Sequence, residues 1–164
     1  MSQDSELHFR EEAFRIFREA YDKQTQGDLE DAIGLYQQSI DIYPTAEAYT
    51  FLGWAYSFQS RYDEAIEACR QAIEVDPDYG NPYNDIGAYL IEKGRLEEAI
   101  PWLEKAVRAK RYESHCYPLY NLGRIWERKG EWQKAFRHYD EALQDNPDYT
   151  LARRAKSRMQ ALFN

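Results

Sequence analysis

Trp54 and Phe58 are the aromatic side chains whose spacing best suits contact with another molecule. They are four residues apart, so in a helix they share one face. Tyr49, Leu52 and Tyr56 would lie on the other side of that helix and build its core. Burying one exposed aromatic side chain contributes about 1.5–3 kcal/mol, so the pair predicts an apolar binding surface. Alternatively, a neighbouring helix covers both rings. The two interpretations stay open for Trp54, whereas Phe58 is expected to be buried.

Arg124 and Arg128 are a second pair with helical i, i+4 spacing. On a helix they would place two guanidinium groups on one ridge, which suits the binding of carboxylates. The alternative is that these charges are solvated or meet Glu127 or Glu131 nearby. The pair therefore predicts an attraction for acidic ligands, to be weighed against ordinary surface pairing.

The residues that usually carry catalysis or bind metals show no such spacing. His8, His115 and His138 form no motif with a nucleophile or a carboxylate pair. Cys116 directly follows His115, whereas structural zinc sites need four ligands at recurring intervals. Cys69 falls at a helix position that favours a small buried residue, and no glycine-rich phosphate loop is present. The sequence predicts no enzyme activity, no metal site and no cofactor.

The elements that would position these residues repeat along the chain. Residues 27–33, 60–66, 94–100 and 130–136 share one pattern, at steps of 33, 34 and 36 residues. Each has Gly or Ser at a turn, then a polar helix start, then Ala and a large apolar residue. A period of this length is typical of a solenoid built from stacked repeats. Such a fold offers a surface for binding, so the function is expected in a groove.

Glycines recur at one position of the repeats. Gly53, Gly87 and Gly123 are 34 and 36 residues apart. Because Gly inside a helix costs roughly 1 kcal/mol relative to Ala, three in register predict close approach of two helices.

The best-defined repeat combines these features in one stretch, 46–79, which ends near Pro77. Its pattern residues are Tyr49, Leu52, Gly53, Tyr56, Ala65, Ala72 and Pro77. In these residues, and in their counterparts over about residues 13–149, the chain resembles the tetratricopeptide repeat family. The resemblance implies an all-α, right-handed superhelical solenoid of four helix-turn-helix repeats in a single domain, 1–164. The repeats are expected at about 13–45, 46–79, 80–115 and 116–149, with a capping helix over 150–164.

The resemblance also implies a concave groove lined by the first helix of each repeat, which binds a peptide segment of a partner protein. Aromatic side chains there would supply affinity, and paired amides of Asn could hold a peptide backbone. The expected groove residues are Phe17, Tyr21, Phe51, Trp54, Phe58, Asn84, Tyr120, Asn121, Arg124 and Arg128.

Some proteins of that family hold the C-terminal carboxylate of a chaperone in a clamp of Lys, Asn and Arg. At the corresponding places this chain has Phe17, Tyr21, Phe51, Asn81 and Asp85. The clamp is therefore missing, and the expected ligand is a different peptide with apolar and acidic character.

The first repeat departs from the pattern. It has Glu19 and Lys23 where apolar residues are expected, which suits a terminal repeat. Another register, with Phe14, Phe17 and Tyr21 as the core triplet, stays open.

The third and last parts of the array depart as well. The third repeat has Arg111 in place of Pro.

After Tyr149, a helical stripe is expected to cover the last repeat, with a basic side toward water. A membrane-surface helix is the less favoured interpretation. The expected stripe is Leu151, Ala155, Met159 and Leu162.

Composition and charge further limit the kinds of partner that are expected. The net charge is −8 and the mean hydropathy is −0.84, and no run is long and apolar enough to span a bilayer. Residues 1–79 hold 17 Asp and Glu against 6 Lys and Arg, whereas residues 80–164 hold 12 against 15. The acidic first half disfavours nucleic acid. Two cysteines and a polar start are consistent with the cytoplasm, without membrane contact.

Two other functions compete with peptide binding. The acidic first half and basic second half could stack head to tail, which would make the chain a self-associating structural unit and a homo-oligomer. A chaperone for an exposed apolar client is a weaker possibility.

Overall fold

The turns between paired helices are built on residues with a left-handed backbone. A computed structural model describes residues 3–163, with side chains for residues 3–162. Gly27, Gly94 and Gly130 have φ of 87°, 74° and 75°, and Ser60 has φ of 59°. Glycine adopts such angles without steric cost, and a left-handed residue commonly ends a helix. Each of the four turns therefore separates two helices of one repeat.

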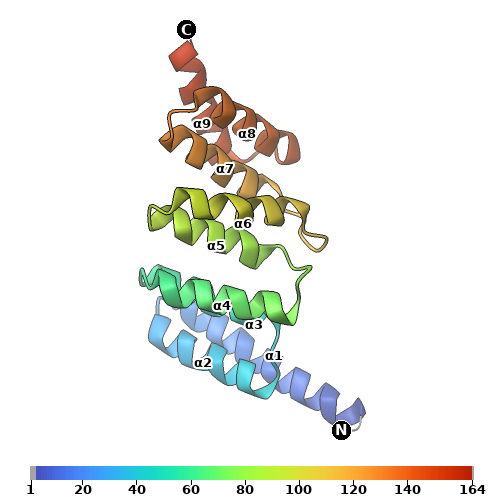
Figure 1. The fold of residues 1–164 in the computed structure, drawn as a ribbon. Coiled ribbons are helices and arrows are strands. Elements are labelled where there is room, and N and C mark those ends of the chain that lie inside the picture. Colours follow the sequence, from blue (N-terminus) through green and yellow to red (C-terminus); the bar gives the residue numbers. More distant parts are fainter. Residues whose placement is uncertain (1–2, 164) are drawn as a thin grey trace. The chain divides into compact units, whose positions relative to one another are not determined.

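The regular structure of residues 3–163 is helical throughout, with no β-strand among them (Figure 1). The predicted all-α fold of helix-turn-helix repeats followed by a C-terminal helix is confirmed. The helices are α1 (Gln3–Gln26), α2 (Leu29–Ile42), α3 (Ala46–Phe58), α4 (Tyr62–Val75), α5 (Asn81–Glu92), α6 (Leu96–Arg108), α7 (Cys116–Arg128), α8 (Trp132–Asp145) and α9 (Thr150–Phe163).

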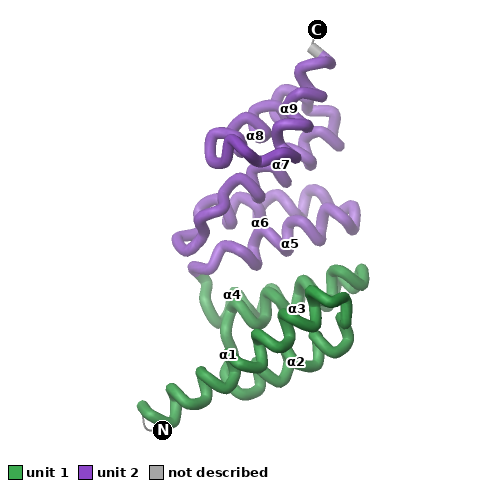
Figure 2. The backbone as a smooth tube through the Cα atoms, turned by 180° about the vertical axis from the view of Figure 1, so that it is seen from behind, with its two compact units in different colours: residues 1–77 green, residues 78–164 purple. Residues whose placement is uncertain are grey.

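The chain forms two compact units, residues 1–77 and residues 78–164 (Figure 2). In the first unit α1 packs on α2 and α3 packs on α4, and α1 and α3 also touch. In the second unit α5 packs on α6, α7 packs on α8, and α5 and α7 touch. The first helices of neighbouring repeats thus line up within each unit. The single domain and the repeat boundaries stay predictions.

The recurring glycines lie where paired helices meet. A Cβ atom added at Gly87 would lie 2.4 Å from Leu103 Cδ2, and one added at Gly123 would lie 2.4 Å from Tyr139 Cε1. At Gly53 an added Cβ would lie 3.1 Å from the carbonyl oxygen of Ala65. The predicted close approach of helices at these positions is confirmed.

The core of the first repeat uses two alanines and an isoleucine of α1. Ala13, Ile16 and Ala20 are buried, whereas Phe14 is 60% exposed and Tyr21 is 46% exposed. The alternative register, with Phe14, Phe17 and Tyr21 as the core triplet, is therefore wrong. Alanines allow α1 to lie close to α2, and the Ser39 hydroxyl donates a hydrogen bond to the carbonyl oxygen of Ala13 at 2.7 Å.

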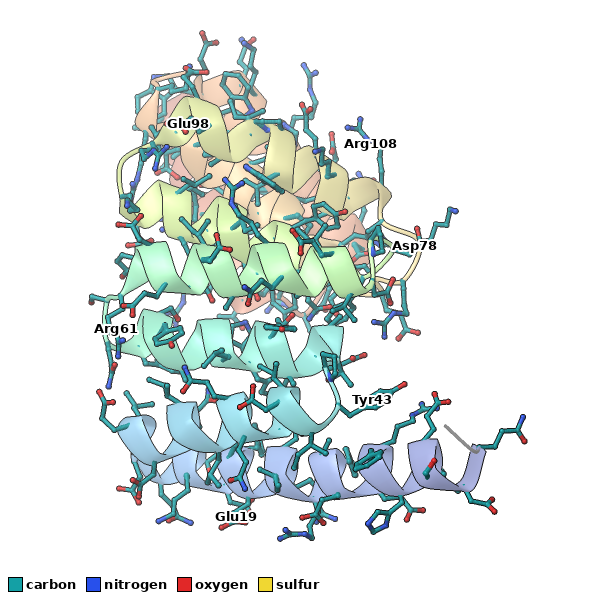
Figure 3. The ribbon with its side chains drawn as sticks, turned by 60° about the horizontal axis from the view of Figure 1, so that its bottom comes forward. Glu19, Tyr43, Arg61, Asp78, Glu98 and Arg108 are labelled. Atoms are coloured by element: carbon teal, nitrogen blue, oxygen red, sulfur yellow. The ribbon has the colours of Figure 1, made fainter. Side chains whose placement is uncertain are left out.

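α1 begins ten residues before the expected start of the first repeat at Ala13. Figures 1 and 3 show α1 continuing past the end of α2, near the labelled Tyr43. The Tyr43 hydroxyl donates to Glu6 Oε1 at 3.4 Å, and the Arg10 guanidinium lies 5.6 Å from the centre of the Tyr43 ring. Polar contacts at the end of α2 thus hold a helical extension that the repeat pattern does not predict.

The loop after α6 pairs with the loop before α5. The Arg111 backbone N–H donates to the Asp78 carbonyl at 2.9 Å, and the Gly80 N–H donates to the Arg111 carbonyl at 3.1 Å. The Arg111 guanidinium lies 4.2 Å from the centre of the Tyr79 ring. Proline has no N–H, so the replacement of Pro by Arg111 provides the first of these bonds.

α9 covers the last repeat, as expected of a capping helix. Its buried residues Ala152, Ala155 and Met159 pack against α8 and the start of α7. Leu151 and Leu162 are exposed, so their predicted place in the buried stripe is wrong. The buried stripe is rotated by about one residue around the helix, because two alanines let α9 lie close to α8.

Candidate functional site

Four predicted groove aromatics meet in the first unit, on α1 and α3. We call Phe17, Tyr21, Phe51 and Trp54 the aromatic cluster. Phe51 lies at its centre: ring centroids are 4.4 Å from Trp54, 5.0 Å from Phe17 and 5.8 Å from Tyr21. Phe17, Phe51 and Trp54 are half-buried, and Tyr21 is exposed. The Trp54 ring packs on Phe51 of its own helix and keeps an accessible surface, so its part in binding stays a prediction.

Phe58, the remaining aromatic residue predicted on α3, lies apart from this cluster. Its side chain is 67% exposed, so the expectation that it is buried is wrong. α3 ends at Phe58, and therefore no further turn of that helix shields the ring.

A groove of about 710 Å³ runs beside the aromatic cluster in the first unit. Its apolar walls include Phe17 and Phe51, together with Leu7, Phe14 and Tyr43, which the sequence did not indicate. Leu7 and Phe14 are 55% and 60% exposed. Leu7 and Phe14 are seven residues apart and so share one face of α1, a spacing that could have indicated these two groove residues.

Three charged residues also line this groove: Arg10, Glu11 and Glu47. Arg10 lies over the Tyr43 ring. Glu11 has no ion-pair partner within the described part of the chain. The groove thus combines an apolar lining with the carboxylate of Glu11.

The two predicted asparagines lie in the second unit and bond to each other. Asn121 Nδ2 donates to Asn84 Oδ1 at 3.0 Å, and Asn84 Nδ2 donates to Asp85 Oδ1 at 3.3 Å. Both residues are buried. The amides therefore link α5 to α7, and part of the hydrogen-bonding capacity expected for a ligand is used inside the fold.

Arg124 and Arg128 extend from α7 to the end of α5. Arg124 donates to Glu92 Oε1 at 2.8 Å and to Asn121 Oδ1 at 3.2 Å. Arg128 donates to the carbonyl oxygen of Ile91 at 3.0 Å. Neither arginine pairs with Glu127 or Glu131, which sequence proximity had suggested.

Glu127 instead forms hydrogen bonds with residues of α8 and α9. It accepts two hydrogen bonds from Arg158, at 3.0 and 2.8 Å, and one from the Tyr139 hydroxyl at 2.5 Å. Burial, together with this bond to Glu127, raises the pKa of Tyr139 well above its usual range. The pKa of Arg158 is raised by its bond to Glu127.

These side chains surround a pocket of about 430 Å³ in the second unit. Tyr120, Arg124 and Arg128 were predicted for the groove, whereas Arg158 comes from the capping helix and Trp132 from the start of α8. Sequence reasoning missed Arg158 and Trp132, because only the packing of α8 and α9 brings them here. The lining residues are Tyr120, Arg124, Glu127, Arg128, Trp132 and Arg158.

Two other features are absent from residues 3–163. No three His, Cys, Asp or Glu side chains among them are placed to hold a metal ion. None of the helices described here combines the length and apolar character needed to cross a membrane. Cys69 and Cys116 are buried free thiols, and burial raises the pKa of Cys116.

The chain is similar in sequence to proteins from several organisms. The chain is 26% identical over 140 residues to anaphase-promoting complex subunit 3 of Schizosaccharomyces pombe, covering 85% of this chain and 21% of that protein. It is 32% identical over 81 residues to small glutamine-rich tetratricopeptide repeat-containing protein 2 of Mycosarcoma maydis, covering 49% of this chain and 23% of that protein. The chain thus spans about a fifth of the length of these relatives.

Solved structures share the fold at low sequence identity. Pseudomonas aeruginosa PilF superimposes with a TM-score of 0.85 at 21% identity, covering 93% of this chain and 70% of that one. The MamA protein superimposes with a TM-score of 0.73 at 22% identity, covering 90% of this chain and 80% of that one.

Sequence profiles described as tetratricopeptide repeat match three segments of the chain. The segments are residues 46–79, 68–100 and 116–149. Together they cover more than half of the sequence, and they include the turns at Ser60, Gly94 and Gly130 and the recurring glycines Gly53, Gly87 and Gly123. The first helix pair, α1 and α2, lies outside them. By sequence and by structure, then, this chain belongs to the tetratricopeptide repeat family.

Proposed function

We propose that the chain is a protein–protein interaction module whose first unit binds an apolar segment of a partner protein. The groove beside the aromatic cluster carries this proposal, because large apolar side chains line it and remain exposed: Leu7 at 55% and Phe14 at 60%. Exposed apolar surface gathered in one groove is typical of binding sites. Membership in the tetratricopeptide repeat family supports the role of interaction module.

The energetics favour a few anchors. Burying a side chain such as Phe14 contributes about 1.5–3 kcal/mol, and association itself costs several kcal/mol of lost freedom. Several apolar contacts in the same groove are therefore needed for useful affinity. Rings such as Phe51 are already held by their neighbours, so little additional ordering is required on binding.

The charge of the first unit indicates which residues flank the apolar anchors of the partner. Residues 1–79 carry 17 acidic against 6 basic side chains, and Glu11 at the groove has no ion-pair partner in the described part of the chain. Complementary charge increases the association rate and favours the correct partner. The proposed ligand of the first unit is therefore an apolar segment with basic flanks.

A random peptide library selected on the immobilised protein tests both parts of the proposal. We expect the enriched peptides whose binding depends on Phe14 to combine large apolar residues with Lys or Arg. In calorimetric titrations of one such peptide, Phe14→Ala should lower the affinity about tenfold, because it removes an anchor. Phe9→Ala is the matched control, because Phe9 is exposed on the same helix but does not line the groove.

Two outcomes would contradict this function. Equal losses for Phe14→Ala and Phe9→Ala would show that the groove is not the binding site. Acidic peptides whose affinity falls with Phe14→Ala would overturn the proposed charge of the partner.

A further inference from the structure

The pocket of the second unit contains more positive charge than its own acidic residues neutralise. Arg124, Arg128 and Arg158 line it, and Glu127 is the single carboxylate among its lining residues. Glu127 accepts both hydrogen bonds of Arg158, and Glu92, outside the lining, pairs with Arg124 at 2.8 Å. These two ion pairs neutralise two of the three guanidinium groups, those of Arg158 and Arg124.

Arg128 is the remaining cation. Its nearest polar partner is the neutral carbonyl of Ile91, at 3.0 Å, and it makes no ion pair within residues 3–163. Glu131, three residues further on, lies 3.6 Å from Lys134 instead. Arg128 therefore has an oriented side chain whose charge is not neutralised by the described residues.

This arrangement suits a carboxylate. A guanidinium group has five N–H donors in a planar fork, and Arg128 uses one of them on Ile91. The free edge can bind both oxygens of a carboxylate, which is the strongest geometry for such a pair. The bond to Ile91 holds the side chain in place, so less conformational freedom is lost on binding.

The rest of the pocket favours a protein segment as the source of the carboxylate. Tyr120 and Trp132 line the pocket, and Trp132 is 43% exposed, so apolar atoms beside the carboxylate would find aromatic surface. A nucleic acid would need a longer basic track, whereas this chain has a net charge of −8.

We infer that the pocket formed by α7, α8 and α9 binds an acidic side chain of a partner protein, with Arg128 as the anchor and Arg124 and Arg158 beside it. This site goes beyond the function proposed above. It lies in the other unit, takes a ligand of opposite charge, and does not depend on the apolar groove.

Fluorescence anisotropy with a labelled peptide of alternating Glu and Leu tests the inference on the full chain. A peptide with Gln in place of Glu serves as the neutral probe, and the salt is kept at about 50 mM so that screening stays weak. We expect the Glu peptide to bind at least about tenfold more tightly than the Gln peptide. Phe14→Ala should leave this binding unchanged, which separates the test from that of the apolar groove.

Arg128→Gln and Arg154→Gln form the matched pair of variants. Each removes one positive charge, but Arg154 is exposed on α9 and does not line the pocket. We expect Arg128→Gln to weaken binding of the Glu peptide about tenfold and Arg154→Gln to change it less than about twofold. Circular dichroism checks that both variants keep their helices.

Three results would overturn the inference. Equal losses in the two variants would indicate a general attraction between charges. Equal binding of the Glu and Gln peptides would exclude recognition of carboxylates. Displacement of the Glu peptide by a single-stranded oligonucleotide at lower concentration than by unlabelled Glu peptide would indicate a phosphate ligand.

Discussion

Single residues set the spacing of the helices in this protein. An added Cβ at Gly87 or Gly123 would lie 2.4 Å from an atom of Leu103 or Tyr139, so no larger residue fits without movement of the partner side chain. Ser60 has a left-handed backbone, with φ of 59°, at the turn of its repeat, whereas the other three turns use glycine. Small size and backbone freedom at a few positions thus determine how closely each pair packs.

His138 on α8 gives the stability of the second unit a defined pH dependence. Its Nδ1 atom is buried without a hydrogen bond among the described residues, and the nearest Glu141 oxygen is 3.6 Å away. Burial lowers the pKa of His138; Arg137 lowers it too, while Glu141 and Glu104 oppose the shift. The unfolded chain, with a histidine pKa of about 6.5, therefore takes up the proton more readily than the folded chain.

We predict that the free energy of unfolding has its full value above about pH 7, where His138 is neutral. It should fall as the pH drops through 6.5 toward the lower pKa that His138 has in the folded protein. Urea unfolding of the wild type and of His138→Gln, at several pH values between about 5.5 and 7.5, measures this effect. The variant should lose less stability over that range, because all other residues are the same in the two proteins. A wild type as insensitive to pH as the variant would contradict the prediction.

At the scale of elements, α9 shows why a helical pattern does not define which face is buried. The stripe of Leu151, Ala155, Met159 and Leu162 has correct helical spacing, yet Ala152 is buried and both leucines are exposed. Neighbouring stripes of one helix share members, so spacing alone fits either rotation. The shape of α8 and Tyr139 decides the rotation, because small residues of α9 must face it.

Truncating the buried methionine of α9 tests this assignment. Met159→Ala should lower the free energy of unfolding by about 2–4 kcal/mol, because it leaves a cavity against Tyr139 and Ala135. Leu162→Ala, on the exposed side of the same helix, should change stability by less than about 0.5 kcal/mol. Urea denaturation of both variants provides the measurement, and a larger loss for Leu162→Ala would reverse the assignment of the buried face.

At the scale of the whole molecule, the two halves of the chain differ in net charge. Residues 1–79 are acidic and residues 80–164 are slightly basic, with 17 against 6 and 12 against 15 charged side chains. The same asymmetry is compatible with two functions: separate sites for different ligands, or head-to-tail association of identical chains.

Sedimentation at low and high salt separates these functions. A module that binds other proteins should remain a monomer at about 20 mM and at about 500 mM salt, since it needs no contact with its own copies. An oligomer that dissociates as salt increases would favour self-association through the opposite charges. This second result would make the chain a structural unit instead.

Much of the fold was predictable from sequence. The period of the turns, Gly53 and its counterparts, and the apolar stripes determine that the chain forms paired helices, because these features depend on local backbone freedom and helical spacing. The aromatic cluster was also predictable in part. Phe17, Phe51 and Trp54 fall at the positions of the repeat that are expected to line the groove.

Only the tertiary structure decided which side chains remain available. It paired Asn84 with Asn121, left Phe58 exposed, extended α1 to build the groove, and brought Arg158 beside Arg128. The physical reason is that exposure and pairing depend on atoms distant in sequence. A repeat pattern describes what each helix contributes, whereas the neighbours packed against it determine how much of each side chain is left for a partner.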